Sequence, residues 1–151
     1  MSLNPVSAVS SAQSKSPEET RELARRLGKE LRPGCLVALN GDLGAGKTVF
    51  AQGLGEGIAV ENSDNIRSPT FAIFDVHEGQ RTMVHVDLYR IEDPEEIEAL
   101  GILDLLADSV VVVEWFERAE GLLGEPDVVV SFQYGSDSPS ERTIDITRSA
   151  R

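Results

Sequence analysis

Cysteine, aromatic residues and long apolar runs are all scarce in this chain of 151 residues. The single cysteine, Cys35, cannot form a disulfide within the chain, which excludes a disulfide-stabilised fold. Aromatic residues make up only 5% of the chain, too few to favour a base-stacking platform. No apolar run approaches the ~20 residues that span a bilayer, and the N-terminus lacks the basic and apolar stretches of a secretory signal. We therefore expect a cytoplasmic protein without membrane contact.

Positive charge is also in short supply. The chain has 14 Lys and Arg residues against 26 Asp and Glu, a net charge of −12 with an isoelectric point near 4.5. A protein that binds nucleic acid by itself needs a basic face to supply most of the affinity. Any role with RNA would therefore depend on a partner that makes the RNA contacts.

What the chain does contain is a glycine-rich segment that fits the phosphate-loop pattern G-x-x-x-x-G-K-[ST]: Gly41, Asp42, Leu43, Gly44, Ala45, Gly46, Lys47 and Thr48. An apolar run at 35–40 predicts a buried strand before it, and residues 48–54 predict a helix after it. Glycines let the backbone amides curl around an anion, and the helix N-terminus adds a positive dipole end. Lys47 would reach the β- and γ-phosphates, and the Thr48 hydroxyl would ligate Mg²⁺.

The N-terminal region divides into a tail and the start of a domain. Residues 1–15 are polar and without periodicity, so we expect a disordered tail followed by one P-loop domain over residues 16–151. Ser16 as N-cap, Pro17 at the first helical position and Glu19 as the capping-box acid predict a helix that runs to about residue 31.

The remaining periodicity predicts an α/β fold, a single P-loop NTPase-like domain. Its mixed sheet would have a parallel core and antiparallel hairpins, flanked by helices. The valine run at 109–115 is typical of a central parallel strand buried on both faces. Hairpins and short helices complete the pattern. Strands are expected at 71–76, 82–89, 127–132 and 143–146. Helices are expected at 94–101, 102–107 and 116–123. In the helix after the loop, Gly53, Gly55 and Gly57 indicate close packing against the sheet and an end near Gly57.

Two acidic residues close strand-like runs. Asp87 follows an apolar run, as does Glu114, and ligands bind at the carboxyl ends of strands in open α/β sheets. Either acid would hold the metal, directly or through water, or would simply be a polar residue where a strand surfaces. Thr70, in Ser-Pro-Thr, is either a γ-phosphate-sensing hydroxyl or part of a strand-entry turn. His85 shares a strand face with Asp87, and a hydrogen-bonded structural role is the favoured interpretation.

The order of the motifs resembles one family. GDLGAGKT, SPTF, HVDLYR followed by DPEE and LG, and VVEW followed by ER occur in succession. This combination is similar to the TsaE (YjeE) family, the small ATPase of bacterial tRNA threonylcarbamoyladenosine synthesis. The resemblance covers about residues 18–147. This chain has Val49 after Thr48, where many relatives are expected to have a second Thr. Because Thr48 is the expected Mg²⁺ ligand, we expect little effect on metal binding.

The resemblance implies a fold, an activity and partners. Members have a P-loop α/β domain, hydrolyse ATP slowly and support the partner proteins TsaD and TsaB. Those partners transfer the threonylcarbamoyl group to the adenosine beside the anticodon, so tRNA is met only indirectly. ATP and Mg²⁺ are the implied cofactors.

The resemblance also implies site residues. Residues 43–48 would contact phosphates, with Thr48 and Glu114 as Mg²⁺ ligands. Lys47, Asp87 and Thr70 would form the catalytic set, in which Asp87 orients or deprotonates water and Thr70 belongs to a switch-like loop. The adenine would meet Thr20 and Arg142.

Three other interpretations share the loop. A small-molecule kinase should have a lid with several phosphate-clamping arginines, for which Arg90 and Arg118 are the obvious candidates. A GTPase should have an N-K-x-D stretch, which the sequence lacks. A non-catalytic nucleotide-sensing module is compatible with the motif, because the loop accounts for nucleotide binding but does not determine whether the nucleotide is hydrolysed.

Overall fold

The structure, a computed structural model, describes residues 8–41, 46–67, 74–119, 121–134 and 141–149. Seven strands form one mixed sheet in the order β1-β7-β6-β2-β5-β4-β3. Its centre is parallel, because β2 pairs with β5 and β6, and β5 pairs with β4. Both edges are antiparallel, through the β3–β4 hairpin and the β1–β7–β6 ribbon. The expected α/β fold with a parallel core and antiparallel hairpins is therefore confirmed.

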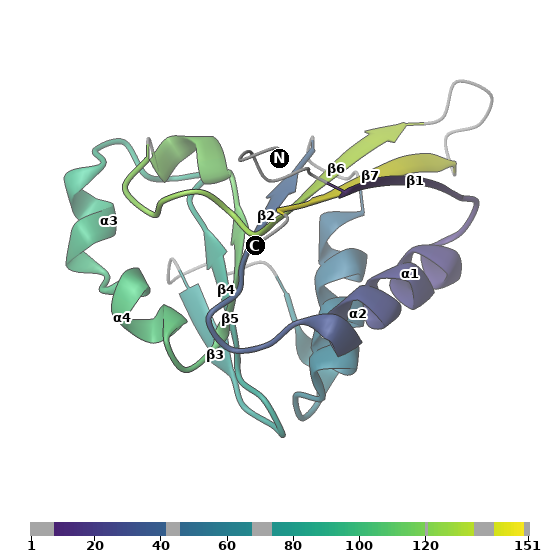
Figure 1. Ribbon diagram of the computed structural model, residues 1–151, viewed down its shortest axis with the longest axis horizontal. Coiled ribbons are helices and arrows are strands. Elements are labelled where there is room, and N and C mark those ends of the chain that lie inside the picture. Colours follow the sequence, from purple (N-terminus) through teal and green to yellow (C-terminus); the bar gives the residue numbers. More distant parts are fainter. Residues whose placement is uncertain (1–7, 42–45, 68–73, 120, 135–140, 150–151) are drawn as a thin grey trace, which may run out of the picture.

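The elements are spread along the whole described chain (Figure 1). The strands are β1 (Ala8–Ser14), β2 (Leu36–Asn40), β3 (Phe74–His77), β4 (Met83–Asp87), β5 (Val110–Glu114), β6 (Val128–Tyr134) and β7 (Arg142–Arg148). The helices are α1 (Pro17–Glu30), α2 (Lys47–Ile58), α3 (Glu95–Ala99) and α4 (Ile102–Leu106). Two short 3₁₀ turns, η1 (Ser63–Asn65) and η2 (Phe116–Ala119), lie between them.

Helix α1 begins where its capping residues predict. The Ser16 hydroxyl accepts a hydrogen bond from the Glu19 backbone N–H at 3.1 Å, and Pro17 is the first helical residue. The Glu19 carboxylate accepts in turn from the backbone N–H of Lys15 at 3.2 Å, one residue before the cap. Ala24, Leu27 and Leu31 then bury one face of the helix.

Two expectations about secondary structure were wrong. Residues 8–14 were expected in a disordered tail, but they form β1, whose seven residues pair with β7. Residues 1–7 lie outside the described residues, and so does part of the strand expected at 71–76. A helix was expected at 116–123, but only the 3₁₀ turn η2 forms. Gly121 and Gly124 follow it with φ of 83° and 77°, a left-handed conformation that ends a helix.

The sheet separates two apolar clusters, and strand alternation decides which residues enter each. Helices α1 and α2 cover one face, where Val110 and Val112 of β5 point. Helices α3 and α4 cover the other face, where Val111 and Val113 point. By the same alternation, Glu114 at the end of β5 lies on the α2 side. On β4, Met83 belongs to the α2-side cluster and Val84 and Val86 to the other, which places His85 and Asp87 on the α2 side as well.

Two of the three glycines of α2 contact helix α1 and not the sheet that we expected. A Cβ at Gly53 would overlap the Arg21 carbonyl oxygen, and one at Gly57 would overlap that of Arg25. Both carbonyls belong to α1, and Gly28 of α1 approaches α2 in the same way. Gly28, Gly53 and Gly57 thus let the two helices pack backbone to backbone. The expected helix end near Gly57 is confirmed, since α2 ends at Ile58.

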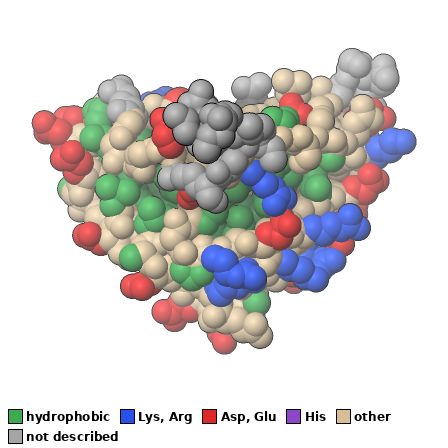
Figure 2. Space-filling model, viewed as in Figure 1, with side chains coloured by type: hydrophobic (Ala, Val, Ile, Leu, Met, Phe, Trp, Pro, Cys, Tyr) green, Lys and Arg blue, Asp and Glu red, His purple; other side chains and the backbone are tan. Residues whose placement is uncertain are grey.

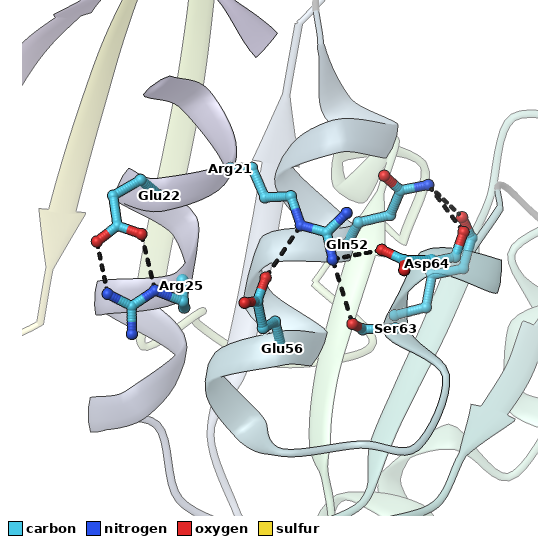
Figure 3. A network of polar contacts seen from close by, with 8 residues as sticks. Arg21, Glu22, Arg25, Gln52, Glu56, Ser63 and Asp64 are labelled. Carbon is cyan, nitrogen blue, oxygen red and sulfur yellow. Dashed lines mark hydrogen bonds and ion pairs between the residues drawn. The ribbon is translucent and has the colours of Figure 1, made fainter. Parts of the chain in front are cut away.

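Charged side chains reinforce the α1–α2 contact (Figure 3). The Arg21 guanidinium lies 3.0 Å from Glu56 of α2 and 2.6 Å from Asp64 of the following turn. On α1 itself, Glu22 accepts two hydrogen bonds from Arg25, which lower the pKa of Glu22 to about 2.

Lys and Arg side chains gather over α1 in Figure 2, whereas Asp and Glu side chains dominate the α3–α4 side. Among the cations of α1, Arg21, Arg25 and Arg26 form ion pairs with carboxylates.

Candidate functional site

The candidate site lies at the carboxyl edge of the parallel strands. Strand β2 ends at Asn40 and helix α2 begins at Lys47, so the glycine-rich segment joins a buried strand to a helix as expected. Gly41 and Gly46 are described, whereas Asp42, Leu43, Gly44 and Ala45 lie outside the described residues. Gly46 has φ of 97° and accepts the hydrogen bond of the Phe50 N–H at 2.9 Å. Glycine is required there, because other side chains rarely adopt that φ.

Lys47 is buried although it is a lysine, with 5% of its surface exposed. Its Nζ lies 3.7 Å from Oε1 of Glu114 and 5.0 Å from the centre of the Trp115 ring. Buried ammonium groups need a compensating charge, and Glu114 provides one. The first residue of α2 is thereby linked directly to the end of β5.

Glu114 is buried as well, and its two carboxylate oxygens face different partners. Its Oε1 faces Lys47, and its Oε2 lies 2.7 Å from Nε2 of His85. His85 is fully buried on the neighbouring strand β4. His85 is hydrogen-bonded, as expected, and its partner is the acid that sequence analysis had selected separately.

Asp87 lies beside Glu114, since the two are register partners at the ends of β4 and β5. The Asp87 Oδ1 accepts the backbone N–H of Tyr89 at 2.9 Å. Burial raises the pKa of Asp87, the Tyr89 hydrogen bond opposes this rise, and the charge of Glu114 adds to it. A half-buried carboxylate with a raised pKa is suited to orienting or deprotonating water.

Trp115 lies next to Glu114 in a strained backbone conformation. Its φ is 60°, a left-handed value that is rare for a bulky residue and that tends to occur at functional sites. Its ring packs against Tyr89 at 5.0 Å between centroids, and the Arg118 guanidinium lies 5.7 Å from the ring centre. Arg118, one of the candidate kinase arginines, also donates to the Ile91 carbonyl at 3.1 Å. This arginine is thus part of an aromatic cluster.

A second part of the site is a pocket of about 130 Å³ beside the start of α2. It is lined by Ser16, Pro17, Thr20, Gly46, Val49 and Arg142. The two expected adenine contacts, Thr20 and Arg142, therefore lie together next to the loop. The Thr20 hydroxyl is 2.6 Å from that of Ser14 in β1, and the Arg142 guanidinium stacks on Tyr134 at 4.3 Å. The sequence alone did not indicate that Val49 lines this pocket or that Ser14 of β1 contacts Thr20, because neither residue belongs to a recognisable motif.

The described side chains suit a hard cation. Glu114 and Asp87 supply carboxylate oxygens and Thr48, the second residue of α2, supplies a hydroxyl, and Mg²⁺ prefers oxygen ligands. Among the described residues, no cluster of three or more His, Cys, Asp or Glu side chains forms a metal cage. Mg²⁺ in nucleotide sites typically takes one or two carboxylates together with phosphates, which these residues fit. Thr70 lies outside the described residues.

The strand–loop–helix unit, the mixed sheet and the acids at the strand ends define a P-loop NTPase-like α/β protein. The model of the family described as Threonylcarbamoyl adenosine biosynthesis protein TsaE matches residues 14–144. The chain belongs to the TsaE family.

Individual relatives agree with this assignment, and each is called tRNA threonylcarbamoyladenosine biosynthesis protein TsaE. The Streptomyces coelicolor protein is 50% identical over 64% of this chain and 67% of its own length. The Rickettsia bellii protein is 37% identical over 87% of this chain and 90% of its own. The Haemophilus influenzae protein is 42% identical, and the match spans 68% of this chain and 65% of that relative.

A solved structure has the same fold. The crystal structure of Bacillus subtilis YdiB aligns with a TM-score of 0.73 at 28% identity, covering 95% of this chain and 88% of that one. Separately, no helix among the described residues is long and apolar enough to cross a membrane.

Proposed function

We propose that this chain is a Mg²⁺-dependent subunit that binds and slowly hydrolyses ATP. In this role it supports threonylcarbamoyl transfer by TsaD and TsaB to the adenosine beside the tRNA anticodon. One observation carries the proposal: Lys47 at the start of α2 contacts Glu114 at the end of β5, and Asp87 lies beside Glu114 at the end of the neighbouring parallel strand β4. A phosphate-binding lysine, a metal-side carboxylate and a water-side carboxylate are what ATP hydrolysis requires.

Each side chain has a defined task in this proposal. The amides of residues 41–48 and the Lys47 ammonium would bind the phosphates, and Thr48 and Glu114 would hold Mg²⁺. When bound, Mg²⁺ would neutralise charge on the β- and γ-phosphates. Asp87 would orient the attacking water and accept its proton, and Thr70 would approach the γ-phosphate from its loop.

The pocket beside α2 is proposed to take the adenine. Its lining includes Thr20 and Arg142, and it adjoins Gly46, the last residue before the helix. A base in this pocket would leave the ribose and phosphates pointing toward the loop. The same pocket connects nucleotide binding to β1 and β7, the strands that hold Ser14 and Arg142 in place.

The charge of the chain supports a role through partner proteins. The net charge of −12 disfavours direct contact with tRNA phosphates, and cations on α1 such as Arg21 and Arg25 are paired with carboxylates. We therefore propose that TsaD and TsaB make the tRNA contacts and that this subunit acts through them.

An ATPase assay with the purified chain, with and without TsaD, TsaB and tRNA, tests the proposal. We expect slow phosphate release without any phosphate acceptor, and threonylcarbamoyl transfer over repeated cycles only when this subunit and ATP are both present. A small-molecule kinase would release almost no phosphate without an acceptor. Multiple-turnover transfer by TsaD and TsaB that is unaffected by this chain would contradict the proposed role.

A further inference from the structure

We propose that His85 is a positioning residue for Glu114. It holds one carboxylate oxygen in place while the other oxygen exchanges Lys47 for Mg²⁺ as nucleotide binds. The inference rests on the proposed function, since it concerns how the same site accepts its metal.

The geometry gives the two oxygens of Glu114 different environments. Oε2 lies 2.7 Å from Nε2 of His85, a short hydrogen-bond distance, whereas Oε1 lies 3.7 Å from the Lys47 ammonium. His85 comes from the middle of β4 and is fully buried, so its position is fixed by the sheet. Lys47 has a long side chain at the edge of a glycine-rich loop. His85 is therefore held by the sheet, whereas Lys47 is attached to α2 only through its long side chain.

Nucleotide binding would separate these partners. When the Lys47 ammonium turns toward the phosphates, Oε1 of Glu114 loses its nearest cation. A buried carboxylate that loses a compensating charge reorients readily unless a fixed donor holds it. The His85 hydrogen bond prevents this and keeps Oε1 directed at the place where Mg²⁺ would bind. Residues that hydrogen-bond to a metal ligand and so fix its orientation typically contribute 10–100-fold to metal affinity.

The other ring nitrogen argues against a role in packing alone. Nδ1 of His85 is buried and has no hydrogen-bond partner in the described part of the chain. An imidazole kept only to fill space would be disfavoured relative to an apolar side chain, because half of its polar groups are unpaired. The hydrogen bond to Glu114 is what the imidazole supplies at this position. In that arrangement Nε2 carries the proton and donates to the carboxylate.

Two substitutions separate hydrogen bonding from packing. His85→Leu keeps an apolar volume and removes the donor, whereas His85→Gln keeps an N–H near the position of Nε2. His77→Leu is a matched control, since this histidine lies on the adjacent strand β3 opposite Met83, at the other end of β4 from Asp87. Nucleotide affinity is measured against Mg²⁺ concentration through the fluorescence of Trp115, the single tryptophan, which lies 5.0 Å from the Lys47 ammonium.

We expect His85→Leu to raise the half-saturating Mg²⁺ concentration by about 10-fold or more, while nucleotide affinity without Mg²⁺ stays unchanged. His85→Gln and His77→Leu should remain close to wild type. A wild-type Mg²⁺ dependence in His85→Leu, or an equal loss in His85→Gln, would overturn the inference. Wild-type protein without Mg²⁺-dependent nucleotide binding would overturn the proposed function as well, so the two failures are distinguishable.

A second measurement remains decisive if His85→Leu does not fold. The ring nitrogens of His85 are examined by NMR in nucleotide-free and metal-free wild-type protein. We expect the tautomer with a proton on Nε2, and a change in its signal in Glu114→Gln. A proton on Nδ1 with an unprotonated Nε2 would overturn the inference.

Discussion

The Lys47 ammonium lies 3.7 Å from Oε1 of Glu114, and both side chains are buried. This ion pair connects the helix that follows the phosphate loop to β5, one of the parallel strands at the centre of the sheet. A triphosphate would have to draw Lys47 away from the carboxylate, which leaves Glu114 available for Mg²⁺. Under the proposed function, binding of the phosphates and of the metal would therefore be coupled.

The first prediction concerns Lys47. Lys47→Ala removes the only side-chain cation described at the start of α2, and charge-assisted hydrogen bonds contribute about 1.5–3 kcal/mol each. We expect ATP affinity to fall by at least about 10-fold, because 1.4 kcal/mol corresponds to a factor of ten. Calorimetric titration with ATP measures the loss, and Lys29→Ala on the exposed side of α1 is the control. Unchanged ATP affinity in Lys47→Ala would exclude the loop as the nucleotide site.

The second prediction separates binding from hydrolysis. Asp87→Asn keeps the shape of the side chain and removes its ability to accept a proton. We expect ATP binding within about 3-fold of wild type and hydrolysis lowered by about 100-fold or more, the usual contribution of a general base. Binding and phosphate release are measured on the same preparations, with Asp108→Asn after α4 as an exposed control. A normal turnover rate would remove Asp87 from the mechanism.

The third prediction is a pH dependence. Because burial raises the pKa of Asp87 above the ordinary value of 3.8, this carboxyl takes up a proton at a higher pH than an exposed aspartate. As a base it must be ionised, so hydrolysis should fall as the pH drops through this raised pKa. The pH profile of kcat should therefore show an acidic limb above pH 3.8. A flat profile down to the acid denaturation of the protein would contradict this assignment.

The fourth prediction concerns stability. In an unconstrained helix, Gly57→Ala should stabilise by about 1 kcal/mol, because alanine is the better helix former. Here a Cβ would overlap the Arg25 carbonyl, and overpacking of this kind costs about 1–3 kcal/mol. We expect net destabilisation, measured by urea unfolding. Lys29→Ala serves as a neutral reference, and an increase in unfolding free energy for Gly57→Ala would contradict the close α1–α2 contact.

Much of the site was predictable because it depends on local pattern. The loop motif with its flanking strand and helix located Lys47, and the ends of apolar runs located Asp87 and Glu114. That His85 shares a face with Asp87 follows from strand alternation alone. What the sequence does not contain is strand order: β4 and β5 are neighbours in the sheet, and only this places His85 beside Glu114.

The errors have a common physical cause. Strand β1 consists mostly of Ser, Ala and Gln, whose weak β-propensity is overridden by pairing with β7. The glycines of α2 indicated a close contact, but periodicity does not distinguish a helix from a sheet as the partner. The helix expected at 116–123 is limited to η2, since Gly121 and Gly124 adopt left-handed conformations. In each case tertiary contacts decide what local preference leaves open.

The most direct test of the account is a crystal structure with Mg²⁺ and a non-hydrolysable ATP analogue. We predict the triphosphate against the amides of residues 41–48, Lys47 turned from Glu114 to the phosphates, and Glu114 and Thr48 at the metal. Asp87 should face the γ-phosphate, and the base should occupy the pocket lined by Thr20 and Arg142. A triphosphate bound elsewhere, or both Asp87 and Glu114 directed away from it, would contradict the account.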